Sequence, residues 1–213
     1  MAYIPEQNAI LLEIAKSGSR SLFAAACELS GTDNPPAKGH HNIKTAIDRA
    51  RCENPTVYAL IRDPAERLLS AISFHFSRKD HTLDSAMNLL MKNGVTFNHA
   101  FATQKSFLYS EGAPHTLRLY RLEDIGELMK AIGHKGVPHK NKRVHIWPDE
   151  DVMSHPLFAD ALAAYECDQE LRKRTWQKPQ SASGQAKPSA SRSQGKQQRT
   201  RTQPTQQTPQ AAE

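Results

Sequence analysis

The sequence predicts an α/β fold of three layers, in which a small parallel sheet is flanked by helices. The main observation is that apolar runs of strand length alternate with segments of helical periodicity. Parallel strands joined by crossover helices produce this alternation, and their carboxyl ends then lie along one edge of the sheet. The second observation is that two strand-to-helix junctions carry basic and hydroxyl residues. Because such sheets bind ligands at that edge, the two junctions are predicted to share one site.

The first junction follows the apolar run 9–14, which has the length of a strand. A small polar loop, 16–19, comes next. Residues 20–29 then have apolar side chains at helical spacing, and Gly31 is a stop signal just past their end. A strand, a loop of small residues and a helix N-terminus are therefore predicted in this order.

An anion, most often a phosphate, is favoured in such a loop by the free N–H groups and the dipole of the helix N-terminus. An ordinary turn with a solvated lysine has a similar local sequence. The loop is not a Walker A motif, because Ile14-Ala15 stands where that motif needs a glycine before the lysine. The residues of the predicted anion-binding loop are Lys16, Ser17, Gly18, Ser19, Arg20 and Ser21.

The second junction follows the β-rich apolar run 56–61. Asp63 is a suitable N-cap residue, and it is followed by a proline and, three positions after the cap, a glutamate. These signals predict a helix over about 64–76. Arg62 is therefore placed where the strand ends, and Ser70 two turns into the helix.

The first junction resembles the 5′-phosphosulfate loop of sulfotransferases, in the K-x-G-T-x-x-L form of their carbohydrate-modifying branch. The second, Arg62-Asp-Pro-x-x-Arg67-x-x-Ser70, resembles the 3′-phosphate motif of the same family. Each motif alone is weak, but both occur here in the right order and at a strand-to-helix junction. The resemblance spans roughly residues 10–171 and thins after Phe76.

This resemblance implies a P-loop-like fold and the donor 3′-phosphoadenosine 5′-phosphosulfate. It implies transfer of the sulfuryl group to a hydroxyl or amine, with a carbohydrate as the expected acceptor and no metal. The loop 16–21 would hold the 5′-phosphate, and Lys16 would neutralise charge growing on the bridging oxygen. Arg62 and Ser70 would hold the 3′-phosphate. A basic segment, 135–143, either closes over that phosphate or is a solvated loop.

The general base is predicted between the first helix and the second strand, where the family commonly has a His or Glu. His41 and His40 are the candidates, with His41 slightly preferred because it is nearer the next helix. Histidine suits the role because its pKa is near neutrality. Glu13, at the end of the first strand, and His75, on the second helix, are the alternatives.

The rest of the domain is predicted as scaffold. Residues 1–8 are a lead-in, and Gln104 and Lys105 are expected on a solvated face rather than facing the substrate cleft. The other predicted elements are helices over 43–51, 83–92, 98–109 and 156–174, a strand over 116–120, and a helix from the Arg121-Leu-Glu-Asp124 segment to about residue 132.

Composition divides the 213 residues into a domain over 1–176 and a tail over 177–213. The tail consists largely of Gln, Ser, Pro, Thr and basic residues, so it cannot bury enough apolar surface to offset its ordering entropy. It is predicted to be disordered. Since it contains six basic residues and one acidic residue, it also carries most of the net charge of +6.

The alternatives to a sulfotransferase are a P-loop-like nucleotide kinase and a non-catalytic nucleic-acid-binding protein. The absent Walker A motif argues against the kinase, and the nearly neutral domain confines nucleic-acid attraction to weak contacts of the tail. Three scattered cysteines are typical of a reducing compartment. No apolar run approaches the ~20 residues of a membrane span, and there is no signal-peptide pattern. A cytoplasmic protein is therefore expected.

Overall fold

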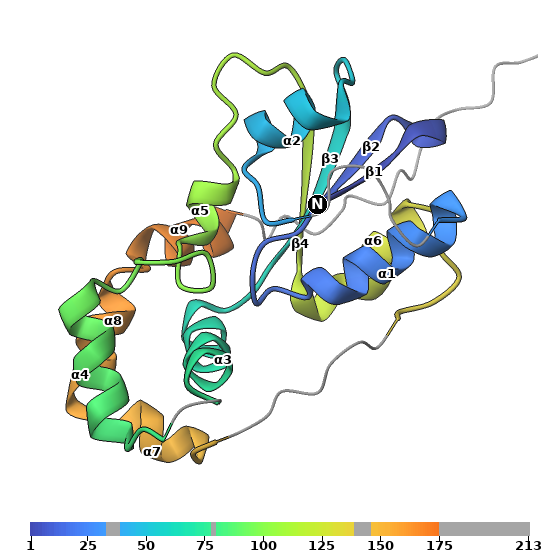
Figure 1. The fold of residues 1–213 in the computed structure, drawn as a ribbon. Helices are drawn as coiled ribbons and strands as arrows, with labels where there is room; N and C mark the ends of the chain where they lie inside the picture. Colours follow the sequence, from blue (N-terminus) through green and yellow to red (C-terminus); the bar gives the residue numbers. More distant parts are fainter. Residues whose placement is uncertain (33–38, 78–79, 139–145, 175–213) are drawn as a thin grey trace, which may run out of the picture. The chain divides into compact units, whose positions relative to one another are not determined.

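The computed structural model describes residues 1–32, 39–77, 80–138 and 146–174, and these form a mixed sheet with helices around it (Figure 1). The strands are β1 (Ala2–Ile4), β2 (Ala9–Leu12), β3 (Thr56–Ile61) and β4 (Thr116–Arg121), in the order β1-β2-β3-β4. Strands β2, β3 and β4 are parallel. The predicted α/β class and the three predicted strands are thus confirmed.

The prediction of a wholly parallel sheet is wrong, because the expected lead-in contains an edge strand. β1 pairs antiparallel with β2, with Ala2 opposite Leu11 and Ile4 opposite Ala9. The short 3-10 helix Pro5–Gln7 reverses the chain between the two strands, and Asn8 follows it in the left-handed region. A tight reversal of this kind joins antiparallel strands, whereas parallel strands need a long crossover.

Helices cover both faces of the sheet, because side chains along each strand alternate between the two faces. On one face, Leu11 and Leu60 pack in one core with residues of helices α1 (Ser19–Ser30) and α6 (Ile125–Ala131). On the other face, Ile10, Leu12 and Val57 pack against α2 (Ile43–Ala50) and against Phe107 of α5 (Gln104–Phe107).

A further apolar core lies among the remaining helices. Most of its buried side chains come from α3 (Pro64–Phe76), α4 (Leu83–Asn93), α7 (Asp149–Ser154) and α8 (Pro156–Ala163). Ala100, Phe101 and Tyr165 add to it from connecting segments. The predicted inward face of α3 is confirmed, since Leu68, Leu69, Ile72 and Phe76 are all buried in this core.

Helix boundaries follow the capping signals of the sequence. The Asn42 side chain accepts a hydrogen bond from the N–H of Thr45 at the start of α2, and Thr82 caps α4 in the same way. Gly31 and Gly94 end α1 and α4 at positive φ. The helix predicted after β4 is confirmed as a 3-10 turn, Leu122–Asp124, followed by α6.

Two predicted helices differ from the structure. Over 98–109 only α5 forms, because the Asn98 and Thr103 side chains accept hydrogen bonds from the N–H groups of Ala100 and Ser106 and so close separate turns. The predicted helix 156–174 is divided at Ala164 into α8 and α9 (Glu166–Arg174). This division accompanies a hydrogen bond from the Tyr165 hydroxyl to the Phe101 carbonyl, 2.6 Å long.

The predicted tail and most of the basic segment 135–143 lie outside the described residues. Among the residues that the structure describes, no helix has the length and apolar character needed to cross a bilayer.

Candidate functional site

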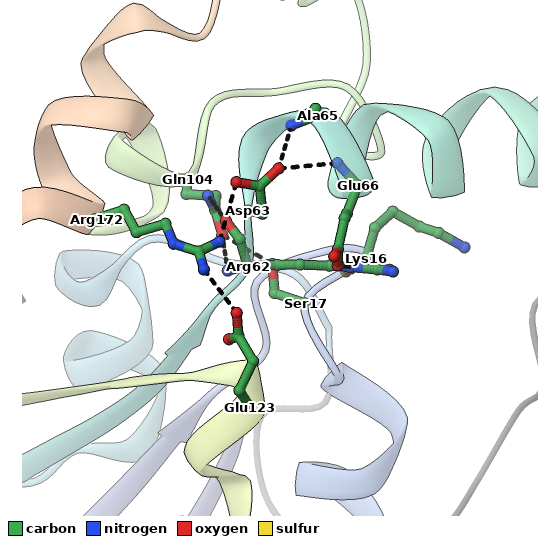
Figure 2. A network of polar contacts seen from close by, with 9 residues as sticks. All are labelled: Lys16, Ser17, Arg62, Asp63, Ala65, Glu66, Gln104, Glu123 and Arg172. Carbon is green, nitrogen blue, oxygen red and sulfur yellow. Dashed lines mark hydrogen bonds and ion pairs between the residues drawn. The ribbon is translucent and has the colours of Figure 1, made fainter. Parts of the chain in front are cut away.

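The two predicted phosphate-binding junctions meet at the carboxyl ends of the neighbouring strands β2 and β3 (Figure 2). A guanidinium nitrogen of Arg62 donates to the carbonyl oxygen of Lys16 over 3.5 Å, although the two residues are 46 positions apart. Helices α1 and α3 begin immediately after these junctions. The two helix N-termini are thus at the same edge of the sheet, as the parallel pairing of β2 and β3 requires.

The Lys16 loop has a strained backbone with two residues at positive φ. Lys16 has φ 63° and Gly18 has φ 81°, while Ser17 between them is outside the positive-φ region. Successive residues with alternating φ direct neighbouring N–H groups to one side, and such concave turns bind anions. The N–H of Ser17 donates to the Ile14 carbonyl (3.2 Å), so an anion at this loop would be held by the first N–H groups of α1.

The loop packs closely on the sheet at Gly18, which is the N-cap of α1. A Cβ atom at this position would lie 2.8 Å from a methyl carbon of Leu122 and 3.1 Å from one of Leu60. Glycine is therefore required at position 18 for two reasons: it tolerates a positive φ, and it has no side chain to clash with Leu122 and Leu60.

The other predicted loop residues differ in exposure. Ser17 is buried, Ser19 and Ser21 are half-buried, and Arg20 is exposed. The ammonium of Lys16 lies 4.1 Å from the centre of the Phe74 ring, on the half-exposed outer side of α3. A cation over an aromatic face is attracted by the ring quadrupole, so Phe74 holds the lysine side chain near the loop.

Arg62 is held from two sides, and its side chain is 19% exposed. Its Nε donates to the exposed Glu66 carboxylate, four residues later, over 3.2 Å. The sequence did not predict this ion pair. Asp63 caps α3 as predicted, since its Oδ1 accepts from the N–H groups of Ala65 and Glu66. Ser70 is buried within α3.

Gln104 joins the two junctions directly. Its Oε1 accepts from the Ser17 hydroxyl (2.9 Å) and from the N–H of Arg62 (2.7 Å), and its Nε2 donates to the Arg62 carbonyl (2.9 Å). The side chain has no exposed surface, so the expected solvated position is wrong for Gln104, while Lys105 is indeed exposed. The Ser17 hydroxyl, predicted as a phosphate donor, uses its proton in this contact.

Helix α9 supports both Gln104 and Asp63. The buried Asp168 carboxylate accepts from the N–H groups of Gln104 (2.7 Å) and Lys105 (2.9 Å). One turn later, Arg172 bridges Asp63 (3.1 Å) and Glu123 (2.7 Å), the latter in the 3-10 turn after β4 (Figure 2). The cap of α3 is thus tied to the segment that follows β4.

Arg67 places a buried positive charge beneath the Lys16 loop. Its Nε donates to the Ala15 carbonyl (2.9 Å), and its guanidinium also donates to the Ala100 carbonyl (3.4 Å). Burial lowers the pKa of the Arg67 guanidinium from its usual value, and the nearby Tyr165 and Asp168 act in the opposite direction. The sequence motif includes Arg67, but sequence reasoning assigned it no role.

The two histidine candidates have different environments. His40 Nδ1 lies 2.7 Å from the Glu13 carbonyl, so this nitrogen carries the proton and Nε2 has the lone pair in the neutral ring. His41 Nε2 is buried, and it lies where a side chain on Gly39 would clash. The burial of His41 Nε2 therefore favours His40 over His41 as the candidate base.

The alternative bases are engaged in structural contacts. The Glu13 carboxylate is buried and pairs with the Met1 amino group at 2.7 Å. His75 packs edge-on against the rings of Phe76, Phe97 and Phe101.

His99 stacks on His40, a contact that sequence reasoning did not identify. The ring centres are 5.2 Å apart and the planes are inclined by 17°. Burial and, secondarily, the neighbouring His40 lower the pKa of His99. The lowered pKa favours the neutral form of His99 beside His40.

Among the residues that the structure describes, no group of three His, Cys, Asp or Glu side chains is arranged to hold a metal ion. No protein-family model, curated protein or solved structure matches this chain.

The close packing at Gly18 predicts that Gly18→Ala destabilises the fold more than Gly31→Ala. Both glycines have positive φ and flank α1, but nothing lies within 4 Å of a Cβ at Gly31. Gly31→Ala should cost about 1 kcal/mol from backbone strain. Gly18→Ala should cost about 1–3 kcal/mol more from overpacking. Urea unfolding measures both, and equal losses would contradict the packing argument.

Proposed function

We propose that the protein is a sulfotransferase that uses 3′-phosphoadenosine 5′-phosphosulfate. The observation that carries the proposal is the meeting of the two junctions, with Arg62 contacting the Lys16 carbonyl and Gln104 bonded to both segments. The donor has one phosphate group at each end of its ribose, so it needs two anion sites close together. Two helix N-termini at neighbouring parallel strands meet this need.

The proposal includes a three-layer, P-loop-like fold. Helices on both faces and a phosphate loop between β2 and α1 support it. The N–H groups of Gly18, Ser19 and Arg20 and the hydroxyls of Ser19 and Ser21 would hold the 5′-phosphate. Arg62 would bind the 3′-phosphate through its guanidinium, which matches phosphate geometry, and Ser70, in the helix α3 that follows, would be its partner.

The reaction would be an in-line displacement at sulfur. The acceptor oxygen or nitrogen forms the new bond to sulfur, the bond from sulfur to the bridging oxygen breaks, and 3′-phosphoadenosine 5′-phosphate leaves. Lys16 stabilises the charge that develops on the bridging oxygen, an effect that counts most in the transition state. The acceptor proton passes to a base. A carbohydrate is the proposed acceptor, on the strength of the sequence resemblance.

Direct ligand binding tests the proposal most simply. Calorimetry should detect 3′-phosphoadenosine 5′-phosphate binding and much weaker ATP binding, because ATP has no 3′-phosphate for Arg62. Arg62→Ala should reduce the bisphosphate affinity by about tenfold to a hundredfold, the value of a lost charged hydrogen bond. Arg49→Ala, on the exposed side of α2, is the control. Preference for ATP in the unmodified protein would indicate a kinase instead.

Lys16→Ala should lower kcat by about 10²–10³ while leaving the thermal unfolding midpoint nearly unchanged. The reason is that Lys16 is half-buried, with its ammonium over the exposed ring of Phe74, and is proposed to act on the transition state. Transfer of labelled sulfate to a panel of glycans measures the rate. Lys44→Ala removes an exposed lysine that pairs with Asp48, and it should retain full activity. Equal rates for both variants would remove Lys16 from the chemistry.

His40 is the proposed base, in preference to His41. His40→Ala should reduce kcat by about 10²–10⁴, the usual contribution of general base catalysis. His41→Ala should act mainly on stability, because His41 Nε2 is buried against Gly39. Comparing kcat with the urea midpoint for both variants separates the two effects. A large loss of kcat in a fully stable His41→Ala protein would reverse the assignment.

A further inference from the structure

Gln104 is the point at which the two junctions are fixed relative to each other. We infer that it is a positioning residue that sets the distance between the 5′-phosphate and 3′-phosphate sites; this inference rests on the proposed function. Its side chain contacts the Ser17 hydroxyl on one junction and the Arg62 backbone on the other, and it has no exposed surface.

The amide is suited to this role because it both donates and accepts. Its Nε2 and Oε1 pair with the C=O and N–H of the same residue, Arg62, at 2.9 and 2.7 Å. A neighbouring strand would form the same two hydrogen bonds to the N–H and C=O of Arg62. The Gln104 amide therefore takes the place of a strand and fixes the backbone just beyond β3. The second bond accepted by Oε1 then ties the Ser17 loop to that backbone.

Gln104 is itself held from behind. Its N–H and that of Lys105 donate to the two oxygens of Asp168, at 2.7 and 2.9 Å, and Asp168 is fully buried. A buried carboxylate with two N–H partners fixes the start of α5, so the amide cannot shift without leaving buried groups unpaired. The spacing of the two junctions is therefore set by a side chain anchored to α9.

The functional consequence concerns ligands with two phosphates. When two anion sites have a fixed and matching separation, binding of the first phosphate makes binding of the second effectively intramolecular. The gain decreases when the separation is no longer fixed, even if each site retains its own affinity. Gln104 should thus govern the advantage of a bisphosphate over a monophosphate, and should matter little for either monophosphate alone.

Gln104→Met tests this inference, since methionine has a similar length but cannot make the three amide hydrogen bonds. Calorimetry would compare 3′-phosphoadenosine 5′-phosphate, adenosine 5′-monophosphate and adenosine 3′-monophosphate. The bisphosphate should lose about tenfold or more in affinity, whereas each monophosphate should change by about twofold or less. Gln7→Met is the control, because Gln7 also donates to a backbone carbonyl, that of Ile132, away from the junctions.

Gln104→Glu provides a second variant that is closer to the original. It keeps an oxygen for Ser17 and the Arg62 N–H but loses the donor to the Arg62 carbonyl, so its bisphosphate advantage should be intermediate. If folded Gln104→Met keeps the full affinity advantage of the bisphosphate over the monophosphates, the inference is wrong. If Gln104→Met does not fold, the same result in folded Gln104→Glu overturns it. If the unmodified protein itself shows no bisphosphate advantage, the proposed function fails instead.

Discussion

Buried polar groups at the edge of the sheet must pair with one another, and this constraint holds the candidate site together. Ser17, Arg67, Gln104 and Asp168 have at most 1% of their surface exposed. They come from the loop after β2, from α3, from α5 and from α9. Each buried polar group left without a partner would cost about 1–3 kcal/mol. Each of these hydrogen bonds joins two different segments of the chain. Moving one segment would therefore leave buried polar groups of its neighbours without a partner, which fixes the four segments relative to one another.

The strand-to-helix junctions could be predicted because their signals are local. An aspartate followed by a proline begins α3, a glycine at positive φ ends α1, and apolar runs form β2 and β3, all within a few residues of one another. β1 could not be predicted in this way. It has three residues, too few to show a period, and it becomes a strand only by pairing with β2. The expected helix over 98–109 failed for a related reason, since Asn98 and Thr103 can cap turns as well as they can lie within a helix.

The residues that connect the junctions could not be recognised from the sequence. Gln104 is followed by a lysine and a serine, and a polar side chain in such surroundings is usually solvated. Its burial depends on Asp168, which lies 64 positions away, so no pattern within a single segment reveals it. Arg67 is a similar case. Arginine is seldom fully buried, and only the convergence of the Ala15 and Ala100 carbonyls makes its burial possible.

The contact between Arg62 and Glu66 is compatible with the role proposed for Arg62. The pair joins an arginine to a carboxylate that is 60% exposed, and exposed pairs of this kind contribute about 0–1 kcal/mol. A hydrogen bond to a phosphate would be worth about 1.5–3 kcal/mol, so exchanging one partner for the other is favourable. The backbone of Arg62 does not take part in this exchange, because Gln104 holds its N–H and C=O. The side chain can thus change partners while its point of attachment stays fixed. Phosphate binding at the proposed site would then leave the Arg62 backbone in place, which lowers the entropic cost of recognition.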